Sequence, residues 1–336
     1  MLITYPYTES QDTKYAYAVG RVRALEDKLL PANRIARLLE AEGGDELLRI
    51  LQDTAYSQWL PETPRDYELI IKQAREELYK LIDKLILEQE IIEQIRLKYD
   101  YYNAKVITKG TIGEKEIDEL LSTFGNINPQ EMKSIFQEER YDKLPYLLSN
   151  AIPEAIEVYY ARKDPRFLDI LLDKYYYFYL RRRDENIFLN TLTKIEIDLV
   201  NIKTFFRVRL LKEESKLLKE AFIGGGFLKL TRFLDPFDEP IEGVPRYFEY
   251  TPYARVVSEG VEYLQSKNSF LRLEKLCDDY FMEFLKRAKY LTFGVEPLIA
   301  YFYAKENEFK MLRMIFVGKL NAVPGDLIKE RLPEVY

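Results

Sequence analysis

Positions 100–105 and 198–203 carry the same polar side chains at the same spacing. The shared pattern is D-x-x-N-x-K, and its polar residues are Asp100, Asn103, Lys105, Asp198, Asn201 and Lys203. A carboxylate accepts hydrogen bonds, an amide both donates and accepts them, and an ammonium group donates them. On a helix, this spacing places the three groups near one flank. The pattern therefore predicts either hydrogen bonds that fix one helical unit against the next or the lining of a central channel or groove.

Fainter copies of the pattern lie towards both ends of the chain. Glu308 and Arg313 keep its charges, but Met311 stands in the Asn position, and Val19-Gly20-Arg21 keeps only the basic residue. Recurrence of this kind indicates a duplicated helical unit. We therefore expect three similar helical domains, spanning residues 1–98, 99–196 and 197–336.

Catalysis by the commonest side-chain machinery is excluded by composition. The chain of 336 residues has no histidine and a single cysteine, Cys277. Ser-His-Asp and Cys-His catalysis and ordinary zinc hydrolysis all need histidine, so we predict no catalytic residue, no metal ligand and no cofactor site. A lone cysteine cannot form an internal disulfide, and Cys277 is expected to be a small buried residue on a helix over 273–285. We expect an intracellular protein.

Two glycine-containing segments invite comparison with phosphate-binding loops. A P-loop requires Lys and Ser or Thr directly after its last glycine, whereas Phe227-Leu228-Lys229 follows Gly224-Gly225-Gly226. We therefore predict a turn or helix end at the triple glycine. Lys109–Gly113 lacks the same features and is expected to be a connector between helices.

The most conspicuous run is Tyr175–Arg183, in which four tyrosines and a phenylalanine precede three arginines. It predicts a packed helix with tyrosine rings buried and arginines in the last turn. A contact with a protein or membrane surface is a second interpretation, and base stacking a third. The net charge of −6 argues against nucleic acid as a general partner.

Helical signals dominate the chain, and we expect an all-α fold. Neither 65–109 nor 166–223 contains glycine or proline, and the first run has apolar residues three and four positions apart. Glu88 interrupts that apolar stripe, so we expect a break there, and Asp184-Glu185-Asn186 is the expected interruption of the second run. No apolar run approaches the ~18 residues that a membrane span needs. Residues 1–12 do not resemble a signal peptide.

The segment Glu296–Lys319 resembles the closing segment of the C subunits of archaeal-type and bacterial V-type ATPases, which are relatives of the d subunits of eukaryotic vacuolar ATPases. The matching residues are Pro297, Tyr301, Lys305, Glu306, Glu308, Leu312, Arg313, Gly318 and Lys319. Tyr15–Arg23 is similar to the opening of that family, and Phe222–Leu230 to its glycine-pair loop. Met311 and Val19 depart from the asparagines that the family has at these positions.

The resemblance implies a funnel of three helical domains around a pseudo-threefold axis. It further implies a non-catalytic rotor component of the central stalk, peripheral on the cytoplasmic face of the membrane. Its partners would be the central shaft and the proteolipid ring, coupled for proton or sodium transport, with neither nucleic acid nor a small-molecule substrate.

Two other functions remain open from the residues alone. A helical-repeat scaffold for protein binding would form an open solenoid with a concave face instead of a closed funnel. A helical enzyme without histidine would need a deep pocket with strongly perturbed carboxylates or lysines.

Overall fold

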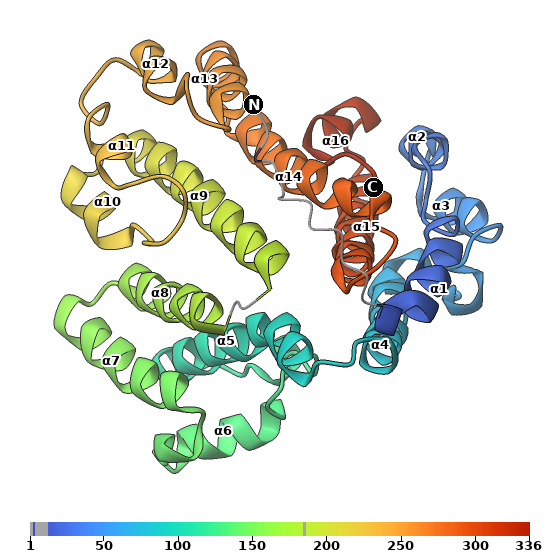
Figure 1. Ribbon diagram of the computed structural model, residues 1–336, viewed down its shortest axis with the longest axis horizontal. Coiled ribbons are helices and arrows are strands. Elements are labelled where there is room, and N and C mark those ends of the chain that lie inside the picture. Colours follow the sequence, from blue (N-terminus) through green and yellow to red (C-terminus); the bar gives the residue numbers. More distant parts are fainter. Residues whose placement is uncertain (1–2, 4–12, 184–185) are drawn as a thin grey trace. The chain divides into compact units, whose positions relative to one another are not determined.

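The computed structural model describes residue 3 and residues 13–183 and 186–336. Its described residues form helices, turns and loops, with no β-strand among them, which confirms the predicted all-α class (Figure 1). They fall into two compact units. Unit 1 comprises Met1–Leu87 together with Glu239–Tyr336, and unit 2 comprises Glu88–Asp238. The division into three domains at 1–98, 99–196 and 197–336 stays a prediction.

Unit 2 contains both full copies of the D-x-x-N-x-K pattern. Its α-helices are α5 (Gln89–Gly113), α6 (Pro129–Gln137), α7 (Tyr146–Arg162), α8 (Pro165–Arg183), α9 (Ile187–Leu210), α10 (Ser215–Ala221) and α11 (Thr231–Leu234). Helix α8 packs against α5, α7, α9 and α10. The two pattern-bearing helices, α5 and α9, therefore share α8 as a common neighbour.

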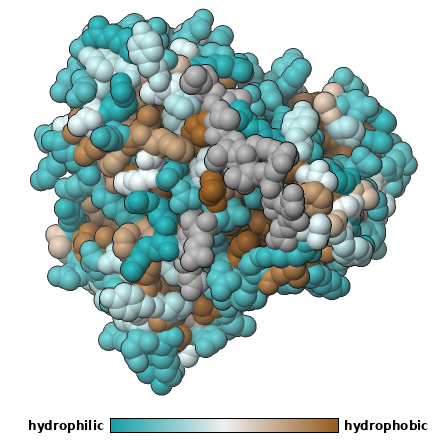
Figure 2. All heavy atoms as spheres, in the orientation of Figure 1, coloured by the Kyte–Doolittle hydropathy of each residue, from teal (hydrophilic) through white to brown (hydrophobic). Residues whose placement is uncertain are grey.

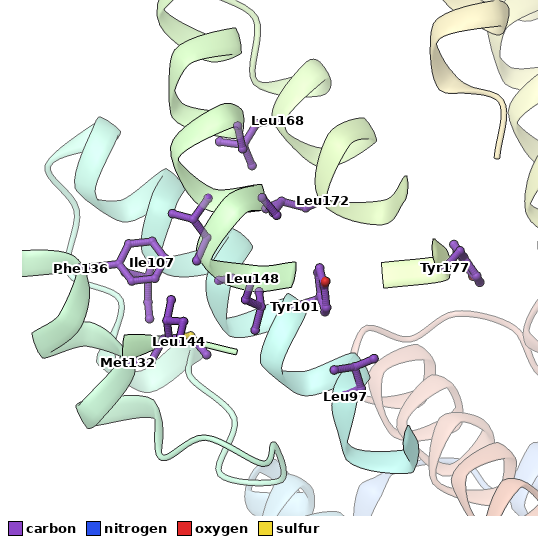
Figure 3. Close-up of a cluster of buried hydrophobic side chains, with 14 of the residues drawn as sticks. Leu97, Tyr101, Ile107, Met132, Phe136, Leu144, Leu148, Leu168, Leu172 and Tyr177 are labelled. Atoms are coloured by element: carbon purple, nitrogen blue, oxygen red, sulfur yellow. The ribbon is translucent and has the colours of Figure 1, made fainter. Parts of the chain in front are cut away.

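The core of unit 2 is built from aliphatic and aromatic side chains of these helices. Figure 3 shows Leu97, Tyr101 and Ile107 of α5 with Leu168 and Leu172 of α8. All five side chains are buried. Removing this apolar surface from water is the main force that holds α5 against α8.

Unit 1 combines the N-terminal and C-terminal parts of the chain. Its α-helices are α1 (Ala16–Glu26), α2 (Ala32–Glu40), α3 (Gly44–Leu51), α4 (Tyr67–Leu85), α12 (Pro245–Phe248), α13 (Ala254–Lys267), α14 (Leu271–Lys286), α15 (Glu296–Leu320) and α16 (Gly325–Arg331). Helix α15 packs against α1, α3 and α4. The C-terminal copy of the pattern thus lies against helices from the other end of the sequence.

The helix boundaries confirm one predicted break and correct another. Glu88, in an extended conformation, separates α4 from α5, as its position in the apolar stripe predicted. The prediction that Lys109–Gly113 is a connector is wrong, because α5 continues to Gly113 and ends where Glu114 adopts a left-handed conformation. Ile117 packs so closely onto the helical Gly110 that a Cβ at this position would lie 2.5 Å from Ile117 Cγ2.

The interruption predicted at 184–186 lies partly outside the described residues. Asn186 is described, and its side chain accepts a hydrogen bond from Leu189 N at 3.0 Å as the N-cap of α9. Residues 184 and 185 lie outside the described ranges, as do residues 1, 2 and 4–12 of the segment tested for a signal peptide.

Two further predictions from the sequence were that Cys277 is buried and that no segment is apolar enough to span a membrane. Cys277 is buried on α14, as predicted. Figure 2 shows hydrophilic side chains over most of the visible face, with hydrophobic side chains between them. None of the helices in the described part of the chain is long and apolar enough to cross a bilayer.

Candidate functional site

The Asn side chain of each pattern in unit 2 forms a pair of hydrogen bonds with one residue of a following loop. Asn103 Nδ2 donates to Ser122 O at 2.8 Å, and Ser122 N donates to Asn103 Oδ1 at 2.8 Å. In the second copy, Asn201 Nδ2 donates to Ile223 O at 2.8 Å, and Ile223 N donates to Asn201 Oδ1 at 2.9 Å. Each amide therefore satisfies both polar groups of a loop residue's backbone.

The Asp side chain of each pattern binds the same loop a few residues further on. Asp100 accepts from Ile127 N at 3.0 Å through Oδ1 and from Asn126 Nδ2 at 2.8 Å through Oδ2. These contacts hold the segment that leads into α6, whose first residue is Pro129. A carboxylate that accepts such bonds fixes the position of the loop relative to its helix.

The second Asp makes equivalent contacts with two backbone N–H groups of its loop. Asp198 accepts from Phe227 N through Oδ2 and from Leu228 N through Oδ1, both at 3.0 Å. One loop thus comes from Ser122–Ile127 and the other from Ile223–Leu228, and the two are held in the same way. This recurrence is independent support for a duplicated unit.

A glycine allows each loop to approach its carboxylate. A Cβ at Gly125 would lie 2.4 Å from Asp100 Oδ1, and a Cβ at Gly226 would lie 2.1 Å from Asp198 Oδ1. Both distances are shorter than a van der Waals contact, so a side chain at either position would force the loop away. Close packing explains why glycine stands at these two positions.

The four Asp and Asn side chains are buried. Asn103 and Asp198 are 0% exposed, and Asp100 and Asn201 are 1% exposed. Burial raises the pKa of the Asp100 carboxyl above its ordinary value, while the hydrogen bonds from Ile127 and Asn126 oppose that rise. These side chains are hydrogen-bonded to the protein's own loops and hold those loops in position.

The first lysine of the pattern contacts a carboxylate of unit 2, and the second acts on one through its charge. Lys105 Nζ lies 2.5 Å from Asp173 Oδ1 on α8. Burial raises the pKa of Asp173, and Lys105 counteracts that effect. In the second copy, burial raises the pKa of Glu196, while the hydrogen bond from Tyr177 and the charge of Lys203 oppose that rise.

The C-terminal copy uses a different set of side chains. Glu308 is 2% exposed, and its Oε2 accepts from Leu30 N at 2.5 Å. Its Oε1 accepts from both Tyr56 and Lys305, and Lys305 Nζ also donates to Tyr56 Oη at 2.7 Å. Tyr56 is fully buried, and burial with the adjacent Glu308 raises its pKa. Glu308 thus holds the segment between α1 and α2 against α15.

The other positions of this copy are apolar or lie nearer to solvent. Arg313 donates to Glu68 on α4 through Nε and Nη2, both at 2.7 Å, and this lowers the pKa of Glu68. Met311 is 2% exposed and packs as an apolar side chain. Sequence reasoning missed the role of Tyr56, because nothing in its own neighbourhood signals a contact with α15. The spacing of Lys305 and Glu308 by one helical turn was the available signal for that pair.

No cluster of three His, Cys, Asp or Glu side chains among the described residues could hold a metal ion.

Comparison with known proteins gives a consistent answer over nearly the whole chain. A profile of the ATP synthase (C/AC39) subunit matches residues 18–331. The C subunit of the V-type sodium ATPase of Enterococcus hirae is 26% identical over 319 residues, which cover 94% of this chain and 97% of that protein. The C subunit of the A-type ATP synthase of Methanosarcina mazei is 26% identical over 345 residues, covering 95% of this chain and 93% of that protein. Its counterpart in Methanocaldococcus jannaschii is 27% identical over 347 residues, covering 95% and 86%.

Proposed function

Because the chain belongs to the family of the ATP synthase (C/AC39) subunit, we propose that it is a non-catalytic central-stalk component of a rotary ATPase. In this role it is a socket that couples the central shaft to the membrane proteolipid ring, and so serves proton or sodium transport. ATP is made or hydrolysed by other subunits. The observation that carries the proposal is the family match over residues 18–331, at nearly full length in both this chain and its relatives.

The repeated contacts support the structural part of this proposal. Asn103 and Asn201 hold equivalent loops in equivalent ways, as expected of duplicated domains. We propose that the domains span residues 1–98, 99–196 and 197–336 and are arranged with pseudo-threefold symmetry around a central opening. The opening would receive the shaft. A coupling element must resist deformation, and close-packed helices with pinned loops have the necessary stiffness.

The buried polar groups support a mechanical instead of a chemical role. Asp100, Asp198 and Glu308 are the buried carboxylates of the copies that contain one, and each accepts a hydrogen bond from a loop backbone of this chain. A catalytic acid or base has to reach a substrate. The proposed location of the chain is the cytoplasmic face of the membrane, where the proteolipid ring and the shaft would meet.

Co-purification tests the proposal. A tagged full-length chain is extracted from its native membranes with a mild detergent, and the associated proteins are identified by mass spectrometry. We expect both the proteolipid and the shaft proteins in near-stoichiometric amounts. Recovery of the chain without either of them would refute the socket, and recovery with unrelated proteins only would favour a helical-repeat scaffold.

A further inference from the structure

A groove lies beside the aromatic and basic run of α8, a feature that the proposed function leaves unexplained. Its volume is about 510 Å³, and it lies between α8 and the loop after α10. The apolar part of its lining comes from Leu171, Tyr175 and Phe178 of α8 and from Phe222 and Ile223 of the loop. Phe178 is 48% exposed, so a large aromatic ring is available to a partner.

The charged part of the lining has one sign. Lys174 and Arg181 line the groove, and none of its described lining residues is a carboxylate. Two carboxylates lie next to the lining and already have partners: Glu220 accepts a hydrogen bond from Arg162 at 2.6 Å, and Glu154 accepts one from Tyr175 Oη at 2.6 Å. The charged side chains that line the groove itself are therefore cationic, although the chain has a net charge of −6.

The cation at the edge of the groove is held in place by the glycine loop. Arg181 Nη1 donates to Gly224 O at 3.4 Å, and the guanidinium lies so close to Gly225 that a Cβ there would be 2.2 Å from Arg181 Cζ. Gly225 has a φ of +103°, a conformation that favours glycine. Asn201 fixes the preceding residue, Ile223, through two hydrogen bonds. Asn201 of the motif therefore fixes the loop whose next residue, Gly224, accepts the hydrogen bond from Arg181.

We propose that this groove binds an acidic segment of a partner protein. Apolar or aromatic side chains of the segment would enter between α8 and residues 222–224, and its carboxylates would meet Lys174 and Arg181. Aromatic anchors beside an arginine are typical of the centre of protein interfaces. The proposal goes beyond the socket function, because it assigns this groove of unit 2 a specific partner chemistry that the socket does not require.

The geometry favours a peptide segment over a lipid or nucleic-acid surface. A membrane surface meets a broad face from which apolar side chains protrude, whereas Leu171 and Tyr175 line a concavity and are partly buried. Binding along a nucleic-acid backbone depends on many phosphate contacts. Two cations beside aromatic side chains fit a short acidic and apolar peptide segment better than they fit a lipid surface or a nucleic acid.

Photo-crosslinking from the groove tests the proposal directly. Phe178 is replaced by p-benzoylphenylalanine in the full-length chain, produced in its native cells, and the crosslinked peptides are sequenced by mass spectrometry. We expect one dominant protein segment with an excess of Asp and Glu and with apolar residues at the crosslinked site. Crosslinks to lipid, to a segment without acidic excess, or to no protein at all would overturn the proposal.

Charge variants carry the second part of the test. Lys174→Glu/Arg181→Glu is expected to lower the crosslink yield about tenfold or more, because it replaces attraction by repulsion. Lys115→Glu/Lys143→Glu changes the net charge equally at exposed positions of unit 2 outside the groove and should leave the yield unchanged. If the first variant unfolds in thermal melts, Lys174→Gln/Arg181→Gln replaces it. An equal yield in groove and control variants would also overturn the proposal.

Discussion

At the scale of single residues, the pattern places polar groups where the chain itself needs them. Asn201 is 1% exposed and faces the backbone of Ile223, whose own side chain is also buried. A loop backbone that passes through a protein interior must find donors and acceptors, because water cannot supply them. The side-chain amide meets this need with one donor and one acceptor, which no apolar residue can do.

Replacing Asn201 by Leu should therefore destabilise the protein strongly. The substitution keeps the approximate size but leaves N–H and C=O of Ile223 without partners, each costing about 1–3 kcal/mol. We expect the unfolding free energy to fall by about 2–5 kcal/mol in urea titrations. Asn33→Leu, at an exposed position, is the matched control and should change it by less than about 0.5 kcal/mol. Equal effects of the two substitutions would contradict this role of Asn201.

The raised pKa of Asp100 predicts a pH dependence with a definite sign. Its pKa in the folded chain lies above the ordinary value of 3.8 because burial disfavours the charged form. Its contribution to stability is therefore fully present below pH 3.8 and is lost as the pH rises through the folded pKa. The unfolding free energy of the native chain minus that of Asp100→Asn should accordingly fall between about pH 3 and 7. A difference that grows over this range would mean that the pKa is lowered.

At the scale of elements, each pattern-bearing helix of unit 2 holds a following loop through its Asp and Asn side chains. Where the loop comes closest to the Asp carboxylate, its residue must lack a side chain. Gly226 is that residue for Asp198. A Cβ at Gly224, in the same loop, would have no atom within 4 Å. The two glycines therefore form a natural matched pair.

Gly226→Ala is expected to reduce stability by about 1–3 kcal/mol, since the new methyl group would displace the carboxylate or the loop. Gly224→Ala should be neutral or slightly stabilising, because it only restricts the unfolded chain. Thermal melts of the two variants decide the matter. Similar melting temperatures would show that the close approach to Asp198 is not required.

The attachments of α15 in unit 1 should differ in strength. Glu308 is buried with Tyr56 and Lys305, so Glu308→Ala leaves an uncompensated lysine and is expected to cost about 3–5 kcal/mol. The pair of Arg313 with Glu68 is largely exposed, so Arg313→Ala should cost less than about 1 kcal/mol. Urea titrations provide the comparison, and a larger loss for Arg313→Ala would contradict it.

Elements with local signals were predictable from the sequence, and long-range contacts were not. Helical periodicity and the polar break at Glu88 are local, and both were confirmed. Gly110 was misleading, because its neighbours favour helix strongly enough to continue α5 through it. The partner of each motif residue is set by tertiary packing: Asp100 meets Ile127, and Glu308 meets Leu30 from the far end of the chain. No pattern in the sequence specifies those pairs.

At the scale of the whole molecule, the family assignment suggests why the loops are held so firmly. In unit 1, α15 packs against helices from the N-terminal part of the chain. Unit 2 contains two copies of the same loop-holding hydrogen bonds. In the proposed role the chain would transmit torque, and loops held by hydrogen bonds would reduce its deformation under load. We therefore expect loss of the chain to uncouple the machine without abolishing its chemistry.

Reconstitution with and without the chain tests the coupling role most directly. ATP hydrolysis and ion uptake are measured together in vesicles that contain the complete ATPase, the ATPase lacking this chain, and the latter with purified chain restored. We predict that hydrolysis persists without the chain, that ion uptake is lost, and that adding the chain restores uptake. Ion uptake that continues undiminished in its absence would contradict a socket between shaft and ring.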